Sequence, residues 1–368
     1  MVGALIHEWV ELRGGSERVL EAIADAYPDA DIYCLWNDAP GRFPGRRVHE
    51  SWLARTPLSR SKVAALPFMP MTWRRLRPAE QPDWILASSH LFAHHAQFVG
   101  ADVPKLAYVH TPARYIWTPE HDPRGRSPLM RAASTLLKPI DRSRAQDVNA
   151  FAANSAFVRD RIRTYWDRDA DVIHPPIDVE RIREVAARRE LLSDTDAETL
   201  ASLPDEFVLG ASRFVPYKGL DTVLRLAAKL DLPVVLAGGG SDEARLRAIA
   251  ADLRIDARFV HDPSDELLVA LFGEATVYVF PPIEDFGMMP VEALAAGGRV
   301  VVNAEGGARE GIAKSDAACA IHFGDLDAAA DQVRALIEQG ARPRESDVDW
   351  LSRERFQERI RDWVGVNV

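Results

Sequence analysis

The sequence predicts an α/β protein composed of two doubly wound domains that face each other across a cleft. Short apolar runs alternate with amphipathic stretches along almost the whole chain, which is typical of strand and helix units stacked into parallel sheets. The alternation occurs twice, on either side of a proline pair and a charge-dense stretch. A length of 368 residues also suits two compact units, because domains usually contain roughly 100–200 residues.

The first half of the chain carries an early helix and six strands. The helix is expected over residues 17–27, where apolar residues share one face. Pro175 and Pro176 cannot continue a helix, so the first domain is expected to cover residues 1–180, with 181–205 as a boundary region. The strands are expected at residues 2–7, 31–35, 84–88, 105–109, 149–154 and 171–174.

The second half repeats the pattern and is expected to form a second domain over residues 181–349. Residues 350–368 carry apolar side chains at helical spacing, so this tail should form a helix that packs back onto the first domain. The helices of the second domain are expected at residues 220–229, 244–252 and 290–296. Its strands are expected at residues 207–211, 233–237, 257–260, 276–280 and 299–303.

Composition excludes several classes of protein. Apolar residues make up 47% and charged residues 27% of the chain, which rules out a collagenous or wholly disordered protein. Cys34 and Cys319 are far apart, so neither a disulfide framework nor a zinc cluster is expected, and a reducing compartment fits best. The chain lacks a basic leader and an apolar run long enough to span a bilayer, so we expect a cytoplasmic protein.

The charge is distributed unevenly. Residues 1–180 hold 23 Lys and Arg against 22 Asp and Glu, a net charge of +1, and the remainder of the chain carries −11. Residues 52–78 nevertheless contain six cations and no acid. A nucleic-acid-binding domain would be basic throughout, so phosphates or membrane lipids are the expected anionic partners, and no nucleic acid is expected. The six cations are Arg55, Arg60, Lys62, Arg74, Arg75 and Arg77.

Large apolar residues lie between these cations. They could enter a lipid interface while the basic side chains meet anionic headgroups, which would place the protein peripherally on the inner face of the plasma membrane. The alternative is an ordinary packed helix with a basic rim. The apolar residues concerned are Trp52, Leu53, Leu66, Phe68, Met69, Met71 and Trp73.

Two basic residues form a candidate phosphate site in the second half. Arg213 and Lys218 lie between the expected strand 207–211 and the helix that follows it. Two cations beside a helix N-terminus can hold a diphosphate. The alternative is a solvated turn with two surface cations.

A second loop follows the expected strand at 276–280. Pro290 suits the first turn of a helix, which leaves the preceding backbone amides free at the positive helix end. Glu284 and Glu292 bracket this turn, and two carboxylates beside an anion site suit a ligand that carries both phosphates and hydroxyls. The alternative is that the acidic residues only favour the helix dipole.

Together these motifs resemble the donor-binding signature of retaining GT-B glycosyltransferases of family 4. The resemblance extends along nearly the whole chain in the expected order, although residues 295–299 carry an extra glycine where the family usually has a basic residue and a proline. Tyr108 to Trp117 is similar to a stretch of bacterial polysaccharide mannosyltransferases. Further matching segments are residues 12–17, 108–112, 154–155, 174–178 and 306–310.

The resemblance implies two Rossmann-like domains in the GT-B arrangement and a role for each matching residue of the second domain. Arg213 and Lys218 would bind the donor diphosphate, Glu292 the ribose hydroxyls and Glu284 the hydroxyls of the transferred sugar. The amides of four consecutive residues would assist. Because two cations and a helix end already face the leaving group, no metal or other cofactor is required. The four residues are Phe286, Gly287, Met288 and Met289.

In the first domain the resemblance assigns Gly14 and Gly15 to donor binding and His110 to contact with the sugar. The alternative for His110 is a histidine that bonds the neighbouring backbone. The retaining reaction would follow a front-face path, in which the leaving phosphate takes the acceptor proton and Glu284 need not act as a nucleophile.

The expected reaction is transfer of a hexose, mannose from GDP-mannose first, to a lipid-linked or membrane-proximal glycan. Asp265 could accept from guanine, although a helix N-cap at Ser264 or Asp265 explains these residues equally well. Two alternative functions are that of a nucleotide-sugar 2-epimerase of similar fold and that of a non-catalytic nucleotide-sugar-binding protein. The complete donor signature disfavours both. Gly238 to Gly240 lack the spacing of a dinucleotide fingerprint, so NAD is not expected.

Overall fold

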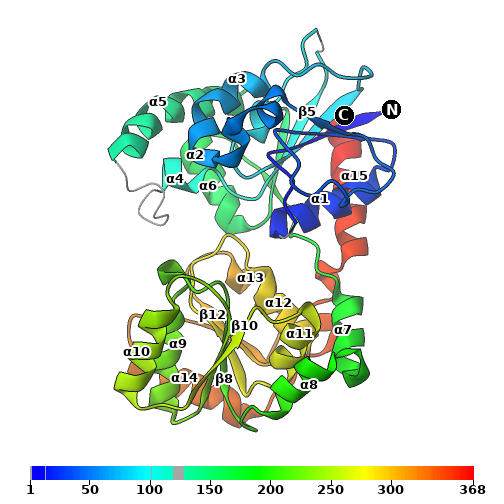
Figure 1. The fold of residues 1–368 in the computed structure, drawn as a ribbon. Helices are drawn as coiled ribbons and strands as arrows, with labels where there is room; N and C mark the ends of the chain where they lie inside the picture. The colour runs from blue at the N-terminus through cyan, green and yellow to red at the C-terminus, as the bar shows by residue number, and fades with distance from the viewer. Residues whose placement is uncertain (1, 13, 101, 119–127) are drawn as a thin grey trace. The chain divides into compact units, whose positions relative to one another are not determined.

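The computed structural model describes residues 2–12, 14–100, 102–118 and 128–368. The chain divides into two compact units (Figure 1). The first comprises Met1–Pro176 together with Glu354–Val368, and the second comprises Ile177–Arg353. The sequence places these two boundaries a few residues away, at 180 and 349. Each unit is an α/β body with its own parallel sheet.

The first unit is built on a seven-stranded sheet in the order β3-β2-β1-β4-β5-β6-β7, and every pair of neighbours is parallel. The six strands expected from the sequence are present. The additional edge strand β3 has only three residues, none of them buried, so it lacks the apolar run that marks the others. The strands are β1 Gly3–His7, β2 Asp31–Cys34, β3 Val48–Glu50, β4 Trp84–Ser89, β5 Lys105–Val109, β6 Ala150–Ala153 and β7 Asp171–Val172.

Helices cover the sheet of the first unit and bury two apolar clusters against it. The early helix starts at Gly15, two residues before the predicted start, and its apolar face is buried as its periodicity predicts. Short 3₁₀ turns at Trp52–Arg55, Pro57–Arg60, Leu66–Phe68 and Ala93–His95 complete the connections. The helices are α1 Gly15–Ala26, α2 Lys62–Ala65, α3 Met69–Trp73, α4 Arg114–Trp117, α5 Pro128–Ala145, α6 Ala156–Trp166 and α15 Arg353–Asn367.

The C-terminal helix α15 belongs to the first unit and lies beside α1 (Figure 1). Its apolar residues enter the same cluster as the inner face of α1. Gln357 and Arg361 donate hydrogen bonds to the carbonyls of Ala22 and Ala26 in α1. The tail therefore forms a helix that packs on α1. The buried residues of the helix are Phe356, Ile360, Trp363 and Val364.

A fully buried carboxylate ties together several elements of the first unit. Asp141 Oδ1 accepts from Nε2 of His95 at 3.0 Å, and Nε2 of His94 lies 3.2 Å from the same oxygen. Its Oδ2 accepts from Nε1 of Trp117 and of Trp166, both at 2.7 Å. Burial alone would raise the pKa of Asp141, but the hydrogen bonds from the histidines outweigh it and hold that pKa well below its ordinary value. Asp141 therefore connects α4, α5, α6 and the turn after β4 as a charged acceptor.

The second unit has a six-stranded parallel sheet in the order β10-β9-β8-β11-β12-β13. Its five predicted strands are present, and β13 adds an edge strand with a single buried residue. The strands are β8 Val208–Ala211, β9 Val234–Gly238, β10 Ala257–His261, β11 Val277–Phe280, β12 Val300–Asn303 and β13 Ala318–Ile321. The helices are α7 Val179–Ala187, α8 Asp194–Ala201, α9 Leu220–Leu230, α10 Glu243–Leu253, α11 Asp265–Glu274, α12 Met288–Ala295, α13 Ala308–Ile312 and α14 Leu326–Gln339.

The charge-dense stretch 181–205 is not a boundary segment, and that prediction was wrong. It contributes most of α7 and all of α8 to the second unit. Val179 and Ile182 enter the core beneath α7, which anchors the helix despite its many charges. The half-buried Arg183 pairs with Asp349 at 2.7 Å, and Arg181 and Glu184 of the same helix are exposed. A high charge density therefore marks the solvated face of a packed helix here.

The basic segment 52–78 divides its apolar residues between the core and the surface. Four of them, Leu53, Leu66, Met69 and Trp73, are buried in the first unit, so the expectation that they enter a lipid interface was wrong. The others remain exposed together with Val63. The exposed apolar residues are Trp52, Val63, Phe68 and Met71. No helix within the described ranges is long and apolar enough to cross a membrane.

Candidate active site

The loop after β8 holds the two expected phosphate-binding cations. Lys218 ends a 3₁₀ turn, and Gly219 then begins α9 in the left-handed region with a φ of 67°. A Cβ at Gly219 would lie 3.1 Å from that of Pro281, so the glycine also permits close packing against the next loop. Lys218 Nζ donates to Glu284 Oε1 at 2.5 Å. Arg213 is exposed and its Nη2 donates to the Tyr217 hydroxyl at 2.5 Å.

The Glu284 loop is held from behind by a glycine turn. The Gly307 amide donates to the Glu284 carbonyl at 2.8 Å, and a Cβ at Gly307 would lie only 1.8 Å from the Asp285 carbonyl oxygen. Asn303 Nδ2 donates to the Pro281 carbonyl at 2.8 Å and fixes the start of the loop. The segment 306–310 therefore positions the backbone of Glu284, a function that requires glycine because no side chain fits there.

Helix α12 follows this loop directly. Gly287 is its N-cap with a φ of 73°, a conformation that disfavours other residues, and Pro290 lies in the first turn as predicted. Phe286 is buried in the core, whereas Met288 and Met289 are half-buried. The first four N–H groups of a helix have no intrahelical partner, which here leaves the amides of Gly287, Met288 and Met289, since Pro290 has no N–H.

Both glutamates lie close to the end of β11. Glu292 is 8% exposed and the Glu284 side chain is 19% exposed. Burial raises the pKa of Tyr278 well above its usual value, and the negative charges of Glu292 and Glu284 add to the effect. The second unit thus brings Lys218, Glu284 and Glu292 to one edge of its sheet.

Asp265 lies at the start of α11, after β10. Ser264 is the N-cap of the helix, because its Oγ accepts from the Leu267 amide at 3.0 Å. Asp265 is the first helical residue, and its side chain is exposed. The capping function therefore belongs to Ser264, and recognition of guanine by Asp265 remains a prediction.

In the first unit, Gly14 and Gly15 mark the start of α1, and Arg13 lies outside the described residues. A Cβ at Gly14 would approach Glu17 Oε2 to 2.0 Å, so the loop folds closely over that carboxylate. Glu17 accepts from Ser16 Oγ at 2.8 Å, and its burial raises its pKa.

His110 follows β5, and its backbone is fixed on both sides. Its amide donates to the Ser89 carbonyl, and its carbonyl accepts from Asn154 Nδ2 at 3.0 Å. The ring Nε2 lies 2.8 Å from Ser88 Oγ. Desolvation, and then the neighbouring His90 and His7, hold the pKa of His110 well below its usual value, so the ring is neutral at pH 7.

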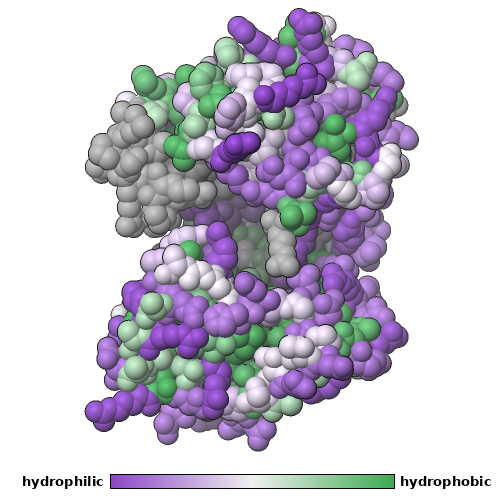
Figure 2. Space-filling model, viewed as in Figure 1, coloured by the Kyte–Doolittle hydropathy of each residue, from purple (hydrophilic) through white to green (hydrophobic). Residues whose placement is uncertain are grey.

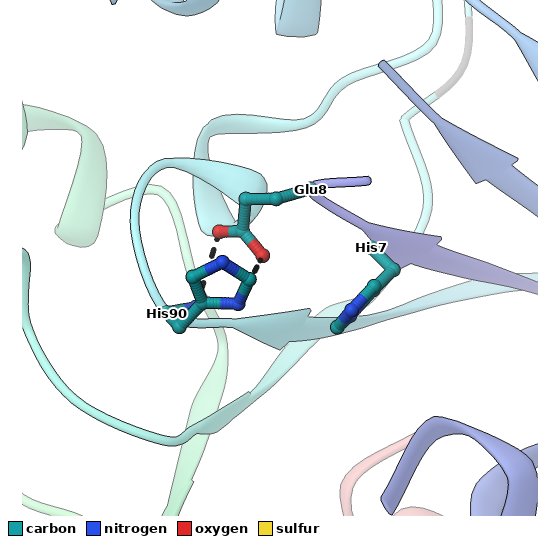
Figure 3. A group of neighbouring side chains, drawn as sticks. All are labelled: His7, Glu8 and His90. Atoms are coloured by element: carbon teal, nitrogen blue, oxygen red, sulfur yellow. Dashed lines mark hydrogen bonds and ion pairs between the residues drawn. The ribbon is translucent and has the colours of Figure 1, made fainter. Parts of the chain in front are cut away.

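The structure adds three residues beside His110 that the sequence analysis missed. His7 is the last residue of β1, Glu8 comes directly after it, and His90 follows β4, so all three lie at the same edge of the sheet (Figure 3). The ring centroid of His110 lies 6.4 Å from that of His7 and 6.2 Å from that of His90. Their position at the carboxyl ends of two predicted strands was the available signal, because ligands of such sheets lie there.

Two family models match consecutive parts of the chain. Glycosyltransferase Family 4 matches residues 13–181, and Glycosyl transferases group 1 matches residues 194–363. The chain belongs to the family 4-like GT-B glycosyltransferases. The resemblance, the α/β fold class and the assignment to the glycosyltransferases are therefore confirmed.

Curated relatives match over a shorter range. D-inositol 3-phosphate glycosyltransferase of Mycobacterium sp. (strain JLS) is 36% identical over 148 residues, which cover 37% of this chain and 32% of that protein. The same enzyme of Mycobacterium tuberculosis (strain ATCC 25177 / H37Ra) is 37% identical over 158 residues, which cover 39% and 31%. The matches thus span about a third of these relatives' length.

Solved structures match this family 4-like GT-B glycosyltransferase chain over nearly its full length. Anabaena Alr3699/HepE in complex with UDP and glucose superposes with a TM-score of 0.71 at 18% identity, covering 98% of this chain and 99% of that one. The lipopolysaccharide outer core galactosyltransferase WaaB superposes with a TM-score of 0.68 at 12% identity, covering both chains completely. At these identities the similarity shows the two-domain fold.

Proposed function

We propose that the protein transfers a hexose from a nucleotide sugar to a lipid-linked or membrane-proximal glycan with retention of anomeric configuration. The observation that carries this proposal is the contact between Lys218 Nζ and Glu284 Oε1 at the N-terminal end of α12. It joins a cation suited to a diphosphate with a carboxylate suited to sugar hydroxyls. These are the two parts of a nucleotide sugar that lie next to each other.

The cations stabilise the leaving group in this proposal. A departing nucleoside diphosphate gains negative charge, and Arg213 and Lys218 are positioned before the reaction starts. Lys218 exchanges its contact with Glu284 for a phosphate oxygen when the donor binds, which frees Glu284 for the sugar. The leaving group therefore needs no divalent metal or other cofactor. Glu284 acts as a hydroxyl acceptor, and the leaving phosphate takes the acceptor proton.

The remaining site residues complete the donor site. Glu292 accepts from the ribose hydroxyls, and the amides at the start of α12 donate to the sugar or the phosphate. In the first unit, the glycines at the start of α1 leave room for the donor, and the neutral His110 contacts the transferred sugar.

The identity of the base and of the sugar in the donor is the most specific part of the proposal. GDP-mannose remains our first expectation, with the exposed Asp265 as the guanine acceptor. HepE has been solved with UDP-glucose, which makes a UDP-hexose the second candidate. GDP-glucose separates the two contributions, because it shares its base with the first and its sugar with the second.

The decisive experiment measures the release of nucleoside diphosphate from GDP-mannose, GDP-glucose and UDP-glucose, with and without bacterial lipid extract. A glycosyltransferase forms a glycosylated lipid in proportion to the nucleotide released, and NMR of the product reports the anomeric configuration. Inversion would contradict the front-face path. Nucleotide release with a free or epimerised sugar and no acceptor would favour a 2-epimerase, and donor binding without turnover would favour a non-catalytic protein.

Substitutions of Glu292 and Glu284 should have different effects, because each glutamate is proposed to contact a different part of the donor. Glu292→Ala should weaken binding of the free nucleoside diphosphate at least tenfold, because two hydroxyl hydrogen bonds to a charged acceptor contribute on the order of 1.5–3 kcal/mol each. Glu284→Ala should leave nucleotide affinity within about twofold of the parent value while transfer falls. Calorimetry with the nucleotide and a transfer assay measure the two quantities. Equal nucleotide affinity in both variants would contradict these roles.

The first unit also carries a surface suited to an anionic membrane. Trp52, Phe68 and Met71 are exposed in the segment 52–78, and the rings of Trp52 and Phe68 lie edge to face at 6.3 Å. Over α2 and α3, hydrophobic side chains alternate with hydrophilic ones (Figure 2). Arg75 and Arg77 are exposed in the same segment. Apolar side chains bordered by cations suit peripheral binding at the cytoplasmic face of a membrane.

Replacing Arg75 and Arg77 with Ser should weaken binding to anionic vesicles roughly thirtyfold, because each cation near a charged surface contributes about 1 kcal/mol. Binding should also fall at high salt and be absent with neutral vesicles. Vesicle sedimentation measures the effect. The matched control replaces the exposed Arg225 and Arg342 of the second unit with Ser, which changes the net charge equally. If both double variants sediment like the parent, the segment is only a basic rim.

A further inference from the structure

Three potential metal ligands converge in the first unit, apart from the residues assigned to the donor. His7 ends β1, Glu8 is the next residue, and His90 follows β4. The two strands are parallel neighbours paired at His7 and Ser88. Each residue offers one ligand atom, and these atoms lie within 4.8 Å of one another (Figure 3). Strand pairing rather than a flexible loop therefore brings the group together.

Glu8 is oriented as a single-oxygen ligand. Its side chain is fully buried. Oε1 accepts from the amides of His90, Leu91 and Ala93 at 3.1, 2.8 and 2.9 Å. Oε2 lies 3.2 Å from His90 Nδ1. Two ligands of a tetrahedral zinc ion are separated by roughly 3.3 Å, because zinc bonds to oxygen and nitrogen are about 2.0–2.1 Å long.

His7 is oriented in the same way. Its Nδ1 lies 3.1 Å from both the carbonyl oxygen and Oγ of Ser88, and the carbonyl oxygen, which can only accept, favours the tautomer that donates from Nδ1. Metal-binding histidines usually donate their second ring nitrogen to a carbonyl or carboxylate. Nε2 of His7 is buried and finds no hydrogen-bond partner within the described part of the chain. The rings of His7 and His90 have centroids 5.5 Å apart, close to the roughly 5 Å expected of two imidazoles on one zinc ion.

We propose that His7, Glu8 and His90 bind a divalent transition metal, Zn²⁺ first among them. Two imidazoles and one carboxylate are the ligands that zinc takes at sites that keep an open position, whereas Mg²⁺ and Ca²⁺ prefer oxygen ligands alone. A dication also offsets the buried charge of Glu8. The fourth position takes an oxygen ligand, either water or a hydroxyl. The proposal goes beyond the transfer reaction and does not depend on it.

The cluster of Asp141 shows why residue types alone do not define such a site. It contains two histidines and one carboxylate, all buried, as the proposed site does. Both oxygens of Asp141 already accept from N–H donors, including the indole nitrogens of Trp117 and Trp166 at 2.7 Å. A metal ion there would have to displace donors that are themselves buried. At the proposed site, in contrast, Nε2 of His7 has no hydrogen-bond partner within the described residues.

The test is a Co²⁺ titration of the full-length, tag-free protein after treatment with a chelator, followed by competition with Zn²⁺. We expect one Co²⁺ per chain with the visible absorption of a four- or five-coordinate site, and its loss on addition of Zn²⁺. His90→Gln should weaken binding at least tenfold. The matched control is His261→Gln, which removes an exposed histidine beside Glu243 and should leave binding unchanged.

Glu8→Gln tests the carboxylate, but Glu8 also holds the turn after β4, so circular dichroism must first establish that this variant folds. If Glu8→Gln does not fold, His90→Gln still tests the metal site. The proposal is overturned if the parent binds no Co²⁺ or Zn²⁺, if the Co²⁺ spectrum is that of a six-coordinate surface ion, or if folded His90→Gln binds the metal as tightly as the parent does.

Discussion

Lys218→Ala is expected to lower the turnover of this glycosyltransferase at least a hundredfold while the fold stays intact. A preorganised electrostatic group that faces charge developing in the transition state typically contributes roughly 10²–10³-fold to the rate. Lys218 contacts Glu284 at 2.5 Å in a half-buried position, so it is already fixed at the place proposed for the departing diphosphate. The side chain belongs to no apolar cluster, and its removal should cost little stability. Release of nucleoside diphosphate and thermal unfolding measure the two quantities.

The matched control for this variant is Lys229→Ala. Lys229 also pairs with a carboxylate, that of Asp327, but it lies at the far end of α9 and is more exposed. Its removal should leave turnover within about twofold of the parent value, since exposed ion pairs contribute at most about 1 kcal/mol. Near-normal transfer by a folded Lys218→Ala protein would remove Lys218 from the proposed mechanism.

The second large effect is expected at Asp141. Asp141→Ala should destabilise the first unit by about 3–5 kcal/mol, because removing one partner of a buried charged network leaves the others unpaired. Three N–H donors, from His95, Trp117 and Trp166, would lose their acceptor at once, and His94 would lose the carboxylate 3.2 Å away. Asp362→Asn on the exposed face of α15 should have no measurable effect.

Urea unfolding followed by tryptophan fluorescence measures this change. Eight of the nine tryptophans lie in the first unit and only Trp350 lies in the second, so the signal reports mainly on the unit that contains Asp141. Unchanged unfolding in folded Asp141→Ala would show that the network contributes little.

The same network predicts the effect of pH on stability. Burial, and then the neighbouring His94, lower the pKa of His95 to about 4 from 6.5. The unfolded chain therefore binds a proton at higher pH than the folded chain, so stability should fall as the pH drops from 6.5 towards 4. The depressed pKa of Asp141 acts in the same direction below its ordinary value of 3.8.

Local sequence patterns were enough to predict the succession of strands and helices along the chain and the loops that carry the proposed donor site. Apolar runs and helical periodicity are local properties, so eleven of the thirteen strands could be placed, and only the weakly apolar edges β3 and β13 were missed. Arg213, Lys218, Glu284 and Glu292 could be singled out because each lies near the end of a predicted strand or the start of the helix that follows.

Which of these residues meet depends on how the strands are arranged in the sheets, and local sequence patterns do not show this. Lys218 and Glu284 are 66 positions apart and touch because β8 and β11 are neighbours in the sheet, and strand order leaves no mark on local periodicity. His7, Glu8 and His90 converge for the same reason, from β1 and β4. In the segment 52–78 the chain changes between 3₁₀ and α turns, so no single period could predict that Trp73 is buried and Trp52 exposed.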